Sequence, residues 1–161
     1  MPTEKNTLQL PESELLSECV RMLREGKTVL LTARGSSMYP FIHDRDKVCL
    51  SREGGFREGD IVLAFTDEGR HVMHRIISIN GDMVRLMGDA NLKKTESCSV
   101  EDIAGKAVSI MRGKKTILCS SAAEKTKAKF WRMLLPVRRA ALKMLRTRDA
   151  VRLRIHAYNQ E

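Results

Sequence analysis

Three short segments of the chain contain residues that could carry out acyl-transfer chemistry. The first reads Gly35-Ser36-Ser37-Met38-Tyr39-Pro40. Gly35 permits a backbone conformation that other residues resist, and Pro40 disfavours helix at the residue before it, so we expect a tight, exposed turn that presents a hydroxyl. A serine is a weak nucleophile until a base takes its proton. Because serines in glycine-containing turns are common, this turn needs a partner elsewhere before it indicates catalysis.

His74 is the most suitable base in the sequence. It lies in the segment 72–77, which has strand character, and histidine is the commonest general base near neutral pH. His71 lies three residues away and would point to the opposite face of the strand, so only one of the two can face Ser37. Histidines in apolar strands are usually half-buried side chains without catalytic work, so His74 alone does not establish a site.

The third segment, Gly88-Asp89-Ala90-Asn91, comes directly after an expected strand. Asp89 would either orient the histidine, as the third member of a catalytic triad does, or cap its own turn. Glu96 and Asp102 follow within the next few residues.

The elements that must position these residues are read from apolar spacing and turn signals. Pro11 can open a helix that Gly26 ends. Asn80-Gly81 indicates a hairpin. From Lys27 to about Leu118, short apolar or β-branched runs alternate with turn residues, which is typical of a small, mostly antiparallel β domain. We expect strands at 28–33, 47–51, 61–65, 71–79, 83–87, 105–111 and 115–119.

The chain therefore divides into three parts. Residues 1–26 form a lead-in and helix, residues 27–119 form the β domain, and residues 120–161 form a linker and a basic amphipathic helical tail. The fold class is mainly β.

The tail carries the whole charge imbalance. The 161 residues have a net charge of +9, yet residues 1–124 contain 18 basic and 18 acidic residues. Pro136 should break any helix there, and beyond it the apolar positions 137, 140, 141, 144 and 145 form a helical stripe, with Arg138, Arg139, Lys143 and Arg146 off it. The stripe either docks on the β domain or, through residues 130–154, binds an anionic membrane surface. Nucleic acid is the less favoured partner, because no DNA-binding motif is present.

Composition excludes several classes of protein. With 42% hydrophobic and 30% charged residues the chain is globular, and no apolar run is long enough to span a bilayer. The N-terminus lacks the pattern of a signal peptide, so we expect a cytoplasmic protein that is peripheral to the membrane. The four cysteines are widely spaced, which favours free thiols and gives no metal-ligand spacing with His71 and His74. We expect no metal and no cofactor.

Taken in order, the segments resemble the signal peptidase I superfamily, and most closely its endoplasmic-reticulum-type branch. The resemblance covers about residues 28–112. It is carried by the Gly-x-Ser-Met-x-Pro turn, Asp46-Lys47-Val48, Gly59-Asp60-Ile61-Val62, His74-Arg75-Ile76, Gly88-Asp89-Ala90-Asn91 and Ile103-Ala104-Gly105-Lys106. It implies a serine endopeptidase with an all-β catalytic core, Ser37 as nucleophile and His74 as base. Asp89 would be an orienting or structural acid, and Glu96 or Asp102 a second acid.

The chain departs from that branch in three places. Gly35 stands where a hydroxyl usually helps to bind the oxyanion, which resembles the related self-cleaving repressor peptidases. Oxyanion or turn support would then come from Gly35, Ser36 and Met38 and from backbone N–H groups. Arg45 occupies a usual glycine position, and we expect no transmembrane anchor, because no apolar run is long enough for one.

Three functions remain open from the sequence. The first is cleavage of an extended signal or leader peptide after small residues. The second is a cytoplasmic peptidase that processes itself or a dedicated partner, for which Ala122-Ala123 and Ala140-Ala141 are candidate sites. The third is a catalytically weak module that binds peptides and membranes.

Overall fold

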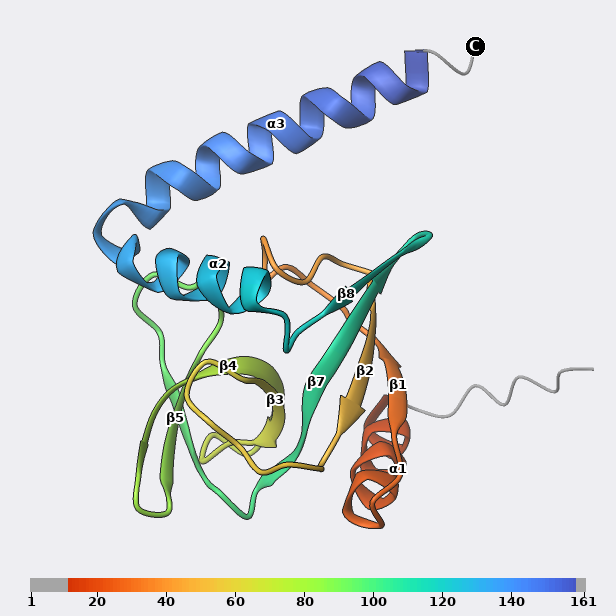
Figure 1. Ribbon diagram of the computed structural model, residues 1–161, viewed down its shortest axis with the longest axis vertical. Coiled ribbons are helices and arrows are strands. Elements are labelled where there is room, and N and C mark those ends of the chain that lie inside the picture. Colours follow the sequence, from red (N-terminus) through yellow and green to blue (C-terminus); the bar gives the residue numbers. More distant parts are fainter. Residues whose placement is uncertain (1–11, 159–161) are drawn as a thin grey trace, which may run out of the picture.

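The computed structural model describes residues 12–158. An N-terminal helix is followed by eight strands and then by two helices that a short 3₁₀ turn connects (Figure 1). In chain order the elements are α1 (Glu12–Arg24), β1 (Val29–Thr32), β2 (Lys47–Ser51), β3 (Ile61–Phe65), β4 (His71–Asn80), β5 (Met83–Met87), β6 (Glu96–Ser99), β7 (Ile103–Arg112), β8 (Lys115–Leu118), α2 (Ala122–Met133), η1 (Leu135–Val137) and α3 (Arg138–Tyr158).

The eight strands form one curled antiparallel sheet, which confirms the predicted mainly β fold (Figure 1). Their order is β1-β2-β7-β3-β4-β5-β6, and β8 pairs with β7. The register shifts at Cys49/Leu50, at Leu63/Ala64 and between Ile76 and Ser78. Such bulges increase the local twist of a strand and so help a sheet to curl. β1 and β6 are the two ends of this order, so one edge of β1 has no strand partner among the described residues.

The curled sheet encloses two apolar cores. One is shared by α1, β1, β2 and β7, and the other lies between β3, β4, β5 and β6. α1 contributes Leu23, which is fully buried, and a Cβ added at Gly105 of β7 would lie only 3.0 Å from the Leu23 side chain. The missing side chain of Gly105 therefore lets the helix approach the sheet closely.

The predicted strands are present, and the sequence missed one more. β6 has the sequence Glu-Ser-Cys-Ser, which contains one apolar residue and therefore gives no strand pattern. The predicted hairpin is confirmed, with Gly81 and Asp82 as its loop residues and Gly81 at a φ of 60°. A glycine with positive φ at the start of a two-residue loop matches the twist of the flanking strands.

The predicted linker is helical almost from its start. Ser121 caps α2, because its hydroxyl accepts a hydrogen bond from the backbone N–H of Glu124. Pro136 breaks the helix as expected, within η1. We call residues 122–158, comprising α2, η1 and α3, the C-terminal arm.

The expected apolar stripe is not the inward face of α3. Among the described side chains of this helix, the buried ones are Arg138, which is 2% exposed, and Leu142, whereas Met144 of the stripe is 70% exposed. The inward face is rotated because Arg138 donates hydrogen bonds to the carbonyls of Asn91 and Trp131 and is therefore held inside. Ala141 and Leu145 are half-buried, so the predicted stripe is divided between the protein and the outside.

Candidate active site

The loop between β1 and β2, residues 33–46, presents Ser37, and we call it the nucleophile loop. Gly35 has a φ of 84°, as the sequence led us to expect, and its N–H donates to Asp44 Oδ1 over 2.9 Å. At the other end of the loop, Asp46 is buried and accepts a hydrogen bond from the Arg112 guanidinium over 2.6 Å. The loop is thereby tied to β7 at its base.

Arg45 is the one described non-glycine residue with a positive φ, at 67°. The left-handed region is costly for a side chain with a Cβ and favours glycine. The backbone at this position therefore has the conformation for which a glycine would be suited. Arg45 keeps that conformation, and its N–H donates to the Ala33 carbonyl over 2.9 Å.

The pairing of β4 with β5 brings the segment after β5 to the histidine. Arg75 lies opposite Met87, so the next step of the same register sets His74 opposite Gly88. A Cβ at Gly88 would lie 2.6 Å from the Ser37 carbonyl oxygen and 3.1 Å from His74 Nε2. The Ser37 backbone and the His74 ring therefore converge on one glycine, where any side chain would separate them. The N–H of Ala90 also donates to the Ser37 carbonyl over 2.8 Å.

The acid that contacts His74 is Glu96. His74 Nδ1 and Glu96 Oε2 are 2.9 Å apart, and the Glu96 side chain is 1% exposed. Its other oxygen accepts a hydrogen bond from the Arg70 guanidinium over 2.9 Å. A carboxylate beside Nδ1 favours the His74 tautomer that carries its proton on Nδ1, in which the lone pair of Nε2 faces Gly88 and the nucleophile loop.

Asp89 pairs with Arg75 and not with His74. Its two oxygens accept hydrogen bonds from Arg75 Nε and Nη2 over 2.8 and 2.6 Å, and both side chains are buried. No hydrogen bond joins Asp89 to His74 in the described part of the chain. Of the two roles that the sequence left open for Asp89, the geometry corresponds to the structural one. Arg75 also donates to the Gly59 carbonyl over 2.7 Å and stacks over Phe41 of the nucleophile loop.

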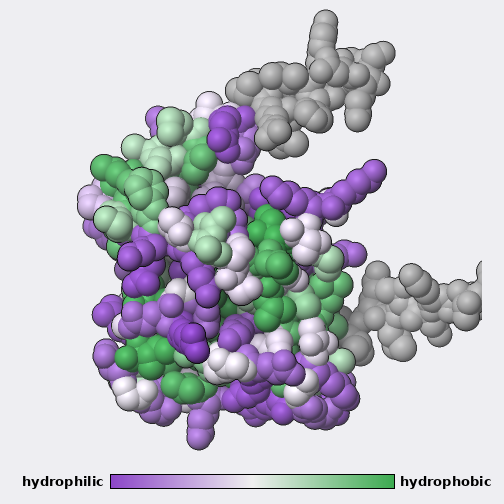
Figure 2. Space-filling model, in the orientation of Figure 1, coloured by the Kyte–Doolittle hydropathy of each residue, from purple (hydrophilic) through white to green (hydrophobic). Residues whose placement is uncertain are grey.

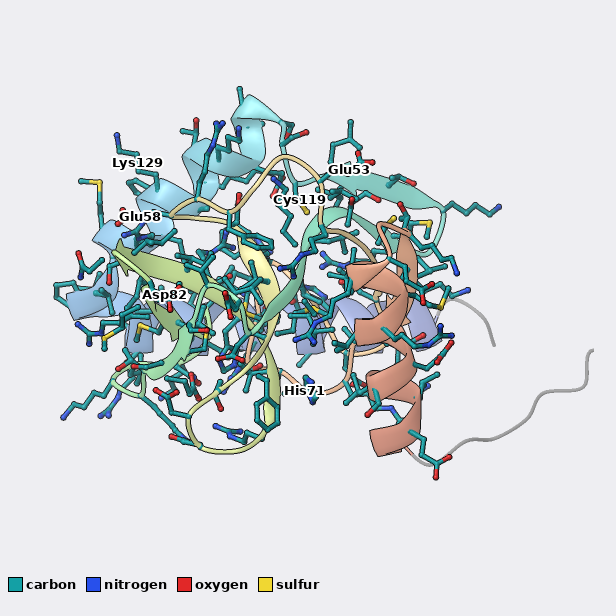
Figure 3. All side chains as sticks on the ribbon, turned by 90° about the horizontal axis from the view of Figure 1, so that it is seen from below. Glu53, Glu58, His71, Asp82, Cys119 and Lys129 are labelled. Atoms are coloured by element: carbon teal, nitrogen blue, oxygen red, sulfur yellow. The ribbon has the colours of Figure 1, made fainter. Side chains whose placement is uncertain are left out.

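Among the described residues, no other candidate forms a hydrogen bond with His74. Asp102 accepts hydrogen bonds from the N–H and hydroxyl of Ser99 and so closes its own turn. His71 packs against Phe65 with ring centroids 4.9 Å apart, and burial lowers its pKa (Figure 3). Met38 is buried in the core, and Ser36 is exposed.

No hydrogen bond joins Ser37 Oγ to His74 among the described residues. The backbone N–H groups of Ser37 and Met38 likewise donate to no atom of the described residues. Catalytic hydrogen bonds are often long or unformed in a free enzyme and tighten when substrate binds. The free N–H groups beside Ser37 are the kind of donor that stabilises an oxyanion.

A groove of about 860 Å³ runs past these residues. Its lining comes from Leu15 and Leu16 of α1, residues 30–32 on β1, the start of the nucleophile loop, and residues 71–74 on β4. Ser37, His74 and Glu96 all line it. A second hollow, lined in part by Glu58, Cys119 and Lys129, lies on the opposite side of the view from His71 in Figure 3.

A serine, a histidine and a carboxylate that converge in a groove of an all-β core are the arrangement of groups found in serine peptidases. The chain belongs to the Peptidase S24-like family, whose model matches residues 3–108. This confirms the superfamily recognised in the sequence, which covers self-cleaving repressors and signal peptidase relatives. A comparison with curated proteins found no match.

Three further observations concern metal binding, the cysteines and the membrane. Within the described residues, no three His, Cys, Asp or Glu side chains are grouped so that they could hold a metal ion. All four cysteines are free, and burial raises the pKa of Cys98 and of Cys119 to about 11. Of the described helices, none has the length and apolar character needed to cross a membrane.

Proposed function

We propose that this protein is a serine endopeptidase in which Ser37 is the nucleophile, His74 the general base and Glu96 the acid that orients His74. The observation that carries the proposal is the convergence at Gly88 of the Ser37 backbone and His74 Nε2, with Nδ1 of the same ring held by Glu96. Family membership supports the same chemistry.

The proposed reaction has two halves. His74 Nε2 takes the proton of the Ser37 hydroxyl while Oγ bonds to the scissile carbonyl carbon, and the oxyanion is received by the N–H groups of Ser37 and Met38. The C–N bond then breaks, and His74 returns the proton to the leaving amine. Water attacks the acyl-enzyme with His74 again as base, which releases the new carboxylate and restores Ser37. Glu96 stabilises the imidazolium in both halves.

We propose that the substrate is an extended peptide, cleaved after small residues, that lies along β1. The groove follows residues 30–32 of β1, whose outer edge is free among the described residues, and Leu30 is 52% exposed there. A peptide added to a free sheet edge gains main-chain hydrogen bonds without demanding a particular sequence.

Cleavage of a separate chain is favoured over self-processing. Ala122-Ala123 opens α2 and Ala140-Ala141 lies within α3, so neither pair is extended. A segment would have to leave its helix before it could lie along a strand edge.

We also propose that the peptidase works at an anionic membrane surface. Five large apolar side chains of the arm are between 43% and 71% exposed: Phe130, Met133, Leu135, Val137 and Met144. We call them the arm patch. Figure 2 shows apolar surface at the corner where α2 meets α3. The exposed cations Lys129, Arg139 and Lys143 border this patch in sequence, and cations beside apolar side chains are typical of interfacial helices.

A cleavage assay tests the peptidase. A peptide with an Ala-x-Ala site is incubated with the wild type, Ser37→Ala and His74→Ala, with and without anionic vesicles, and the products are read by mass. We expect cleavage by the wild type and a loss of about 10³-fold or more in kcat in both variants. Ser120→Ala, an exposed serine beyond β8, is the matched control and should cleave like the wild type. Equal rates in wild type and Ser37→Ala would reject the proposal.

A further inference from the structure

The C-terminal arm contacts both loops that form the candidate site. Trp131 of α2 is 7% exposed, and its Nε1–H donates to the Asp89 carbonyl over 2.8 Å. The edge of the same ring meets Phe41 of the nucleophile loop, with centroids 6.4 Å apart. One side chain of the arm therefore bridges the nucleophile loop and the Gly88–Asn91 segment.

Arg138 extends this bridge from the start of α3. It donates to the Trp131 carbonyl over 3.0 Å and to the Asn91 carbonyl over 3.2 Å, and its guanidinium lies over the Trp131 ring. Arg138 is 2% exposed, and its Nε has no partner among the described residues. Removing the Arg138 guanidinium from water costs free energy, and its hydrogen bonds to two carbonyls offset only part of that cost. The contact therefore depends on the packing of the arm against the loops.

A second contact lies further along α3. The Tyr39 hydroxyl, two residues after Ser37, donates to Asp149 Oδ2 over 2.5 Å, and the Arg146 guanidinium lies 6.0 Å from the centre of the Tyr39 ring. The residues that make this contact are 110 positions apart in the chain. The arm thus reaches the nucleophile loop at two places, through Phe41 and through Tyr39.

We infer that Trp131, Arg138 and Asp149 are positioning residues, which hold the nucleophile loop and the Gly88–Asn91 segment in one fixed relation. The N–H of Ala90 joins the two loops directly by its hydrogen bond to the Ser37 carbonyl, and the loops approach each other closely at Gly88. The family match ends at residue 108, so the arm that spans both loops lies outside the part of the chain that the family defines. This inference rests on the proposed function for its effect on catalysis, but the holding of the loops can be measured without it.

Small displacements of the reacting groups lower the rate of reaction strongly. A misplacement of about 1 Å can lower a rate by about 10²-fold, because nucleophile and base must meet in a near-attack geometry. Loss of an arm contact should therefore lower kcat, while the groove along β1, which the arm does not line in the described residues, keeps its affinity for peptide.

The test uses full-length variants that remove single arm contacts. Asp149→Ala and Tyr39→Phe abolish the same hydrogen bond, and Trp131→Phe keeps an aromatic ring but removes the Nε1–H donor. Thr126→Ala, an exposed α2 residue whose side chain makes no hydrogen bond among the described residues, is the matched control. Hydrogen exchange is followed for residues 35–44 and 88–91, and kcat and KM are measured on the Ala-x-Ala peptide.

We expect exchange in both loops to rise about fivefold or more in Asp149→Ala and Trp131→Phe, with β3 and β4 unchanged. In the same variants kcat should fall by about 3- to 10-fold with KM within twofold, and the double variant of Tyr39 and Asp149 should resemble the single ones. Wild-type exchange in the loops, or faster exchange with unchanged kcat, would overturn the inference. If the wild type itself cleaves nothing, the proposed function fails, while the exchange result still decides whether the arm holds the loops.

Discussion

Two buried carboxylates flank the candidate base, and their partners differ. Glu96 contacts the His74 ring, whereas Asp89 is bound on both oxygens by Arg75. A carboxylate that orients a catalytic histidine affects chiefly the rate, while one that neutralises a buried arginine affects chiefly stability. The two acids can therefore be separated by matched amide substitutions.

We expect Glu96→Gln to lower kcat by about 10²-fold or more, because an amide no longer fixes the His74 tautomer or stabilises the imidazolium. Asp89→Asn should lower the free energy of unfolding by about 3 kcal/mol or more, because it leaves the buried Arg75 charge uncompensated. Peptide cleavage and urea unfolding are measured on both. A stable Asp89→Asn enzyme without activity, beside a fully active Glu96→Gln enzyme, would assign the orienting role to Asp89.

At the scale of elements, the nucleophile loop is fixed at three points. Arg112 binds Asp46 at its base, Arg75 and Trp131 meet Phe41, and Asp149 accepts from Tyr39. Arg112 and Arg75 anchor the loop from the sheet, whereas Trp131 and Asp149 anchor it from the C-terminal arm. The contact at Asp149 is the one that depends on pH.

The pH dependence follows from Tyr39. Burial, and then the hydrogen bond to Asp149, raises the pKa of Tyr39 to about 12 from an ordinary value of about 10. Since the folded state favours the protonated phenol, this contribution to stability is complete below pH 10 and is lost as the pH rises from about 10 to 12. We expect the difference in unfolding free energy between wild type and Tyr39→Phe to shrink over that range.

Urea unfolding at pH 8, 9, 10 and 11 checks this expectation, because every other titrating group is shared by the two proteins. A constant difference across the series would show that the Tyr39 hydroxyl does not titrate with folding. Asp149→Ala should reduce the same alkaline loss, since it removes the acceptor.

The sequence predicted the elements well where apolar spacing was regular. The N-terminal helix, the strands from β1 to β5, β7 and β8, and the hairpin at Gly81 are present. β6 was missed because Cys98 is its only apolar residue, although Glu96 on that strand was already a candidate acid. The sequence could not show that Glu96 is the acid beside His74, because that contact depends on β4 and β6 lying on either side of β5.

The C-terminal arm shows the other limit. Pro136 located the break in the arm, but helical periodicity placed Arg138 outside the apolar stripe, and the structure buries it. The charge of an arginine predicts an exposed side chain. Arg138 is buried because it donates hydrogen bonds to the carbonyls of Asn91 and Trp131, and no local sequence pattern shows that these two residues lie together. The pairing of Arg75 with Asp89, 14 residues apart, was missed for the same reason.

At the scale of the whole molecule, the net positive charge and the exposed apolar side chains of the arm patch lie on the same part of the chain. Residues 125–161 contain 11 basic and two acidic residues, so they carry the full net charge of +9. The arm patch lies on the same helices. Cations near an anionic leaflet contribute about 1 kcal/mol each, and apolar side chains add their burial.

We expect vesicles with anionic lipid to bind the protein, and Phe130→Ser with Met133→Ser to weaken that binding about 10-fold or more, because two exposed side chains no longer enter the interface. Leu118→Ser, which removes an equally exposed apolar residue from β8, is the control. Binding is followed by co-sedimentation across salt, with duplex DNA in parallel. Equal loss in the control, or tighter binding to DNA than to vesicles, would contradict membrane docking.

Trp131 is the only tryptophan in the chain, and it lies buried where the arm meets both loops. Its intrinsic fluorescence is therefore a built-in optical reporter of this junction, without any attached dye. A ring packed beside Phe41 and Arg138 should emit at short wavelength, and separation of the arm from the loops should move the emission to the red. Peptides, vesicles and alkaline buffer can each be added to the unmodified protein, and the emission wavelength of Trp131 reports whether the arm has separated from the loops.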